Sequence, residues 1–165
     1  MVISGGERLT NNTKVYEDRL YKNDGKGNFT ESTFFTRPDS GSFIKASDFD
    51  KDGDIDLFIG GRYIDGSYPL SPKSYLLVNE NGTFVDATKN ILKTNGELGM
   101  LSDALFTDFD NDNSIDLILV GEYMTPVFLK TRKAYSMMFP APPELKMPAG
   151  GGTVLHQVIL TRMET

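Results

Sequence analysis

The chain has 165 residues, of which 39% are hydrophobic and 24% charged, and this is the mix of an ordinary globular domain with a core. Its net charge of −6 argues against a nucleic-acid partner, which would need a basic surface. The lack of cysteine excludes disulfides and thiolate metal sites. No apolar run approaches the roughly 18 residues of a membrane span, and the opening residues MVISGG lack the pattern of a signal peptide.

The N-terminal third of the chain predicts short strands. Residues 2–6 (VISGG) have the pattern of a strand that ends in glycine, and we expect it to be the last strand of an earlier unit. Residues 20–23 are β-rich and lead through an Asn/Gly turn to residues 27–30. This pattern indicates a β-hairpin.

Two Asp-rich segments then follow each other at an offset of 60 residues. The first, residues 48–56, precedes the apolar run LFIGG at 57–61, and the second, residues 108–116, precedes LILVG at 117–121. A further hairpin pattern lies between them at residues 75–85. Repeats of about 40–60 residues that hold a few short strands are typical of propeller blades. The sequence therefore predicts an all-β fold, a partial β-propeller of about two four-stranded blades plus part of a third.

The spacing within the two Asp-rich segments predicts cation sites. Carboxylates stand at relative positions 1, 3, 5 and 9, and position 7 can offer a backbone carbonyl. The candidate ligands are Asp48, Asp50, Asp52, Asp54 and Asp56 in the first loop and Asp108, Asp110, Asp112, Ser114 and Asp116 in the second. Ca²⁺ takes 6–8 oxygen ligands, which these residues and water can supply. Position 6 needs a residue that tolerates positive φ, and Gly53 and Asn113 both do.

An EF-hand shares the opening of this pattern but requires a bidentate Glu at position 12. That position holds Ile59 in the first loop and Leu119 in the second, which excludes the EF-hand. The remaining alternative is a pair of solvated acidic turns without an ion. Because two clusters share both spacing and context, the sequence favours ion binding.

Three segments resemble the FG-GAP/VCBS class of propeller repeats and, more narrowly, the ASPIC/UnbV proteins, relatives of cartilage acidic protein. They are residues 46–62 (ASDFDKDGDIDLFIGGR), 68–88 and 99–124. The resemblance covers about residues 1–130 and implies calcium in a loop between two strands of each blade. It also implies a secreted, periplasmic or cell-surface location. It transfers no catalytic residues, and Asn113 departs from the glycine that the family usually has there.

Residues 131–165 differ from the rest of the chain, with four of its eight prolines, four of its seven methionines and the single histidine, His156. When the frame is shifted by one base, residues 146–165 can be decoded as NAGGWWNSIASGDFDKDGD, which contains the next expected Asp loop. We therefore predict that this tail is an out-of-frame translation of the next repeat. A disordered natural tail is the alternative. His156 receives no role.

These features predict a calcium-binding propeller module that is not an enzyme. Its expected partners are an unknown protein or glycan and the remaining blades of a longer propeller chain. One alternative is a fragment of a propeller enzyme that acts on polysaccharides. A second alternative is a purely structural role, in which calcium only stabilises the blades and the chain binds no partner.

Overall fold

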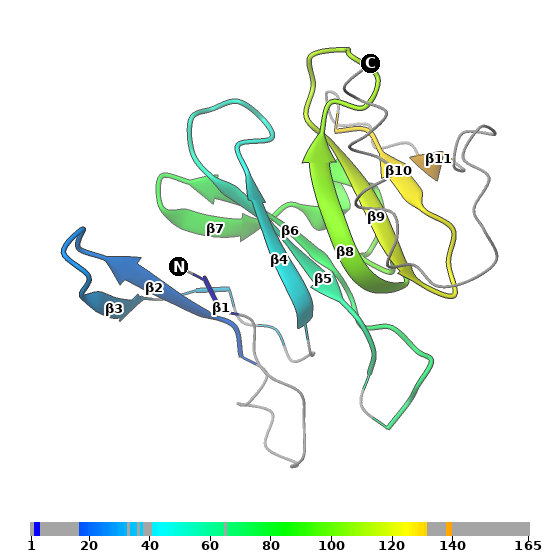
Figure 1. Ribbon diagram of the computed structural model, residues 1–165, viewed down its shortest axis with the longest axis horizontal. Coiled ribbons are helices and arrows are strands. Elements are labelled where there is room, and N and C mark those ends of the chain that lie inside the picture. The colour runs from blue at the N-terminus through cyan, green and yellow to red at the C-terminus, as the bar shows by residue number, and fades with distance from the viewer. Residues whose placement is uncertain are drawn as a thin grey trace.

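The computed structural model describes residues 2–3, 17–32, 34–35, 37, 41–64, 66–131 and 138–139. Within these residues the chain is mostly β and forms three small antiparallel sheets in chain order (Figure 1). The first sheet contains β1 (Val2–Ile3), β2 (Arg19–Asn23) and β3 (Phe29–Ser32). The second contains β4 (Gly41–Ser47), β5 (Asp56–Gly61), β6 (Tyr75–Glu80) and β7 (Thr83–Asp86). The third contains β8 (Met100–Thr107), β9 (Asp116–Glu122), β10 (Val127–Leu129) and β11 (Met138–Phe139).

The second and third sheets repeat each other closely. In both, four strands pair in sequential order. The first strand of each carries one extra residue, Ser42 in β4 and Ser102 in β8, at a bulge. Gly61 and Gly121 pair beside these bulges. The 60-residue offset seen in the sequence therefore extends to the irregularities of the sheets.

The place of β1 corrects one expectation. We expected residues 2–6 to end an earlier unit, but β1 pairs with β2, with Val2 opposite Leu20. The equivalent pair in the second sheet is β5 with β6, where Leu57 lies opposite Leu77. An apolar strand pairs with the hairpin that follows it in both cases. The three-stranded sheet is thus one incomplete unit rather than the join of two.

The expected all-β fold also needs a small correction. A four-residue helix, α1 (Thr88–Ile91), follows β7 and leads toward β8. Thr88 is buried and its hydroxyl accepts a hydrogen bond from the backbone N–H of Leu76 at 2.9 Å. Within the described part of the chain, no helix has the length and hydropathy that a membrane span requires.

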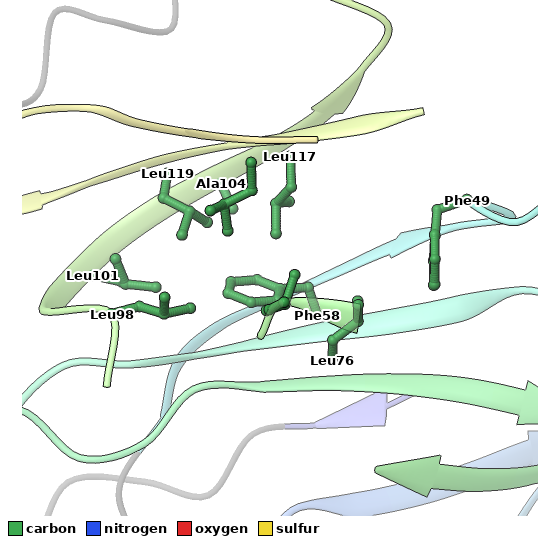
Figure 2. Packing of buried hydrophobic residues seen from close by; sticks show 10 residues of the cluster. Phe49, Phe58, Leu76, Leu98, Leu101, Ala104, Leu117 and Leu119 are labelled. Carbon is green, nitrogen blue, oxygen red and sulfur yellow. The ribbon is translucent and has the colours of Figure 1, made fainter. Parts of the chain in front are cut away.

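β5 is buried along its whole length, and its side chains alternate between apolar clusters on the two faces of the second sheet. Phe58 and Leu76 point toward the third sheet and pack in a cluster with its buried leucines (Figure 2). Leu57, Ile59 and Leu77 pack on the opposite face, together with Phe34, Phe35 and other half-buried side chains. β4 and β8, the first strands of their sheets, lie side by side (Figure 1). The two four-stranded sheets therefore stack as neighbouring layers with an apolar core between them.

Candidate metal centre

Each Asp-rich loop joins the first two strands of a four-stranded sheet. The first loop leaves β4 after Ser47 and enters β5 at Asp56, and the second leaves β8 after Thr107 and enters β9 at Asp116. Asp56 and Asp116 are completely buried, although each is the last carboxylate of its loop. The rigid strand therefore fixes one carboxylate, and the loop must bring the others to it.

Local hydrogen bonds curl the first loop. Asp48 Oδ2 accepts the backbone N–H of Gly53 at 3.2 Å, and Asp52 Oδ1 accepts that of Asp54 at 2.8 Å. Asp54 Oδ2 in turn accepts the N–H of Asn81 at 3.2 Å, which joins the loop to the turn between β6 and β7. The chain thus bends back on itself within a few residues.

The second loop repeats this pattern. Asp108 Oδ2 accepts the N–H of Asn113 at 2.8 Å, and Asp112 Oδ1 accepts that of Ser114 at 2.9 Å. These bonds match those of Asp48 and Asp52 at the 60-residue offset. Both loops therefore have the same backbone path despite their different sequences.

Two residues in each loop adopt the left-handed conformation. Position 6 does so as expected, with φ of 99° at Gly53 and 64° at Asn113. Position 4 does so as well, with φ of 64° at Lys51 and 58° at Asn111. A left-handed conformation is not expected of a lysine from sequence, because only Gly, Asn and Asp adopt it readily.

The curled loops gather carboxylates into two triads. In each triad one oxygen per residue lies within 4.8 Å of the others, and the members are Asp48, Asp50 and Asp56 in one loop and Asp108, Asp110 and Asp116 in the other. Among the described residues, these are the groups whose acidic side chains lie close enough to share a metal ion. The remaining candidates, Asp52, Asp54, Asp112 and Ser114, lie beside the triads. Their roles as ligands stay predictions.

Hydrogen bonds from the sheet hold the buried member of each triad. Asp56 accepts the N–H of Phe49 at 3.2 Å and that of Asn79 at 2.9 Å. Asp116 accepts the N–H of Thr131 at 3.2 Å through Oδ1. By contrast, the buried atoms Asp48 Oδ1 and Asp116 Oδ2 have no hydrogen-bond partner among the described residues. A buried carboxylate oxygen without a partner is costly, and a bound cation would satisfy it.

The electrostatics of the triads agree with this arrangement. The pKa of Asp56 is raised from its ordinary 3.8 to about 6, with burial as the largest cause and the charges of Asp50 and Asp52 as smaller ones. Burial likewise raises the pKa values of Asp50 and Asp116. Loss of solvent contributes more to these pKa shifts than repulsion among the carboxylates does. A cation placed between the carboxylates would favour their charged forms.

This shift predicts how the stability of the metal-free chain depends on pH. Between about pH 4 and pH 6 the folded chain holds a proton on Asp56 that the unfolded chain has lost, so the free energy of unfolding falls as pH rises. The lowered pKa of Asp24 acts only below its ordinary 3.8, outside this window. We expect the Tm in EDTA to be lower at about pH 6.5 than at about pH 4.5. In Asp56→Asn the decrease should be smaller, and a Tm that rises across the window would contradict the assignment.

The donor set determines which ion the triads suit. All the converging atoms are carboxylate oxygens, and the described part of the chain contains no histidine or cysteine. Hard cations such as Ca²⁺ and Mg²⁺ prefer oxygen, whereas Zn²⁺ is usually held by nitrogen and sulfur.

Comparison with known families matches the part of the chain that contains both Asp loops. Residues 48–119 match the FG-GAP-like repeat family. The match begins at Asp48, the first aspartate of the first loop, and ends within β9, so it contains both Asp triads and all of β5 to β8. FG-GAP-like repeats imply propeller blades, which agrees with the stacked four-stranded sheets. Searches of the curated proteins and of the solved structures found no significant match.

Sequence reasoning did not find three residues around the FG-GAP-like loops. Asn79 and Thr131 hold Asp56 and Asp116 through their backbone N–H groups, which any residue except proline could do. Lys130 forms an ion pair with Asp110 and lies 3.6 Å from Asp112 Oδ2. Lys130 and Thr131 stand on the expected boundary between propeller and tail, and β11 pairs with β10 beyond it. The third sheet thus includes Met138 and Phe139, while residues 132–137 and 140–165 of the predicted tail lie outside the described residues, and the boundary near residue 130 stays a prediction.

Proposed function

We propose that this chain is a calcium-binding recognition module of a secreted, periplasmic or cell-surface propeller, of the ASPIC/UnbV type. Two Asp triads at equivalent positions of two stacked sheets are the observation that supports it most strongly. Neither triad is a scatter of surface acids, because each includes a fully buried carboxylate held by the sheet.

Calcium fits these loops better than magnesium. Each triad supplies three carboxylates, and the neighbouring residues at positions 5 and 7 add oxygens that bring the total toward the 6–8 that calcium takes. Magnesium demands a small octahedral shell and usually keeps several waters. A loop rich in carboxylates therefore favours the larger ion.

In this proposal calcium stabilises the blades and takes no part in a catalytic reaction. Its charge offsets the repulsion within a triad and satisfies the oxygens of Asp48 and Asp116 that lack partners. The loop then holds the start of β5 or β9 in place, and each of these strands has a neighbouring strand on both sides. No catalytic step is assigned to the triads, because their carboxylates serve as ligands.

The recognition surface in this proposal lies at the other end of the strands. β5 starts in the first Asp loop and ends at Gly61, and the connection that follows faces the turn after β9. There a hollow of about 320 Å³ is lined by residues that include Tyr68, Glu122 and Tyr123. Tyr68 and Tyr123 are 58% and 83% exposed, and their hydroxyls are hydrogen-bonded at 2.9 Å.

The conformation of Tyr123 supports a role in binding. Its φ of 55° is unusual for a bulky residue, and such strain concentrates at ligand sites. Beside it, Arg62 Nη2 and Glu122 Oε1 lie 2.7 Å apart and join the two sheets across this surface. Exposed tyrosines are enriched in binding surfaces because they combine a large apolar ring with a polar group.

A binding screen tests the proposed function. The chain is incubated with arrays of glycans and of extracellular matrix proteins, once in calcium and once in EDTA. We expect a ligand that is retained in calcium, lost in EDTA and lost with Tyr123→Ala. Tyr21→Ala, on the first sheet, is the matched control and should bind normally. Equal binding by Tyr123→Ala would contradict the assigned surface, and the absence of any ligand would favour a purely structural module.

A further inference from the structure

We propose that Lys130 gives the second Asp loop an internal positive charge, so that this loop holds its shape without calcium and binds calcium more weakly than the first. This inference rests on the proposed function, since it concerns the same two loops. It assigns the two loops different roles. The first loop depends on the ion to hold its shape, whereas the negative charge of the second loop is already partly neutralised by Lys130.

The repeat shows which residue of the first loop corresponds to Lys130. Leu57 lies opposite Leu77 in the second sheet, and Leu117 lies opposite Leu129 in the third. The residue after each of these partners is Val78 in one sheet and Lys130 in the other.

The next position confirms this alignment. The N–H of Asn79 donates to Asp56, and the N–H of Thr131 donates to Asp116 in the same way. Their side chains also match, because Asn79 Nδ2 and Thr131 Oγ1 donate to the carbonyl oxygen of the residue before that Asp. Lys130 therefore places an ammonium group where the first sheet has an apolar side chain.

Lys130 directs this ammonium into the second loop. Nζ forms an ion pair with Asp110, which is a member of the triad, and lies 3.6 Å from Asp112 Oδ2. It also lies 5.8 Å from the centre of the Phe109 ring. The side chains of Lys130 and Asp112 are 22% and 13% exposed, so water screens this charge only in part.

A second lysine adds to the difference between the loops. Lys51 belongs to the first loop, but its Nζ donates to the carbonyl oxygen of Asn113 in the second. In the part of the chain that the structure describes, no lysine or arginine pairs with the aspartates of the first loop. Both nearby ammonium groups therefore face the second loop.

The consequence follows from charge alone. A divalent ion that enters the second loop must approach or displace the ammonium of Lys130, whereas an ion in the first loop meets none. Without the ion, the carboxylates of the first loop repel one another, but Lys130 offsets this repulsion in the second. Calcium should therefore fill the first loop at lower concentration.

Calorimetry on single-loop variants of the full chain tests this. Asp110→Ala leaves the first loop intact, and Asp50→Ala leaves the second. We expect the second loop to bind calcium more weakly, and Lys130→Met added to Asp50→Ala to tighten that binding by about tenfold. Lys26→Met, an exposed lysine in the β2–β3 turn, is the control and should change nothing. Unchanged second-loop affinity in Lys130→Met would overturn the proposal.

A measurement without calcium separates this inference from the proposed function. In EDTA, Lys130→Met should lower the Tm because the repulsion among Asp108, Asp110 and Asp112 is no longer offset, and Lys26→Met should not. An unchanged Tm in EDTA overturns the role of Lys130 even if both loops bind calcium. If neither loop binds calcium while Lys130→Met still lowers the Tm in EDTA, the proposed function fails, and the positive charge that Lys130 supplies to the second loop is supported on its own.

Discussion

Replacing Asp50 with alanine is expected to lower the calcium affinity of the first loop by more than about 100-fold, since even loss of a residue that only supports a ligand costs 10- to 100-fold. Asp50 is exposed and belongs to the triad, so its loss removes a ligand without opening the core. Calorimetric titration with calcium measures the effect. Asp50→Asn keeps the shape of the side chain and loses its charge. Its calcium affinity should lie between that of the unchanged chain and that of Asp50→Ala.

The control for Asp50→Ala is Glu31→Ala, which removes an exposed carboxylate from β3, outside both loops. It lowers the overall negative charge equally but should leave calcium binding intact. If both variants lose the same affinity, calcium responds to net charge rather than to a built site. If neither loses affinity, the first triad is not a ligand set.

Replacing Phe58 with alanine should lower the free energy of unfolding by about 3–5 kcal/mol, the usual cost of removing a buried phenylalanine. Phe58 is completely buried in the core between the second and third sheets (Figure 2). Its ring lies 6.1 Å from that of Phe43, centre to centre. Urea unfolding, followed by circular dichroism in excess calcium, measures this loss.

Val85→Ala is the matched control for Phe58→Ala, because Val85 lies in the same sheet but is 40% exposed. It should cost well under 1 kcal/mol, as expected for a side chain that is partly in solvent. A small effect of Phe58→Ala would mean that the two sheets do not pack as described. In that case the FG-GAP-like repeat would not form stacked blades in this chain.

The sequence predicted much of the fold because it repeats. The spacing of the acids indicated that Asp48, Asp50, Asp52 and Asp56 would converge, and the structure brings three of these four into one triad, with Asp52 outside it. Gly53 indicated where the loop turns. The run LFIGG at 57–61 indicated an apolar strand, and β5 is buried along its whole length. These features are local, so they can be identified without knowing which strands pair.

Contacts between distant residues could not be predicted in this way. Asp18 and Arg37 form a buried ion pair whose side chains are both fully buried, although nothing near them in the sequence marks either as internal. Lys130 reaches Asp110 across 20 residues, and only the pairing of β9 with β10 brings them together. Such contacts depend on the register of the sheet, which sequence patterns leave open.

The prediction that residues from about 131 onward are translated out of frame rests on sequence alone. Most of residues 131–165 lie outside the described residues. Of the residues that are described there, Thr131 donates its N–H to Asp116, and β11 pairs with β10. Sequencing of the coding DNA would decide this question directly.

Equilibrium dialysis of the full chain against radioactive calcium decides whether the two Asp loops are calcium sites. Far-UV circular dichroism first confirms that the sample is folded, and excess magnesium is present throughout. We expect one calcium ion to bind per chain at low calcium concentration and a second at higher calcium concentration. No bound calcium at millimolar concentration in a folded sample would contradict this expectation and would leave the triads as acidic turns of a β-sheet protein.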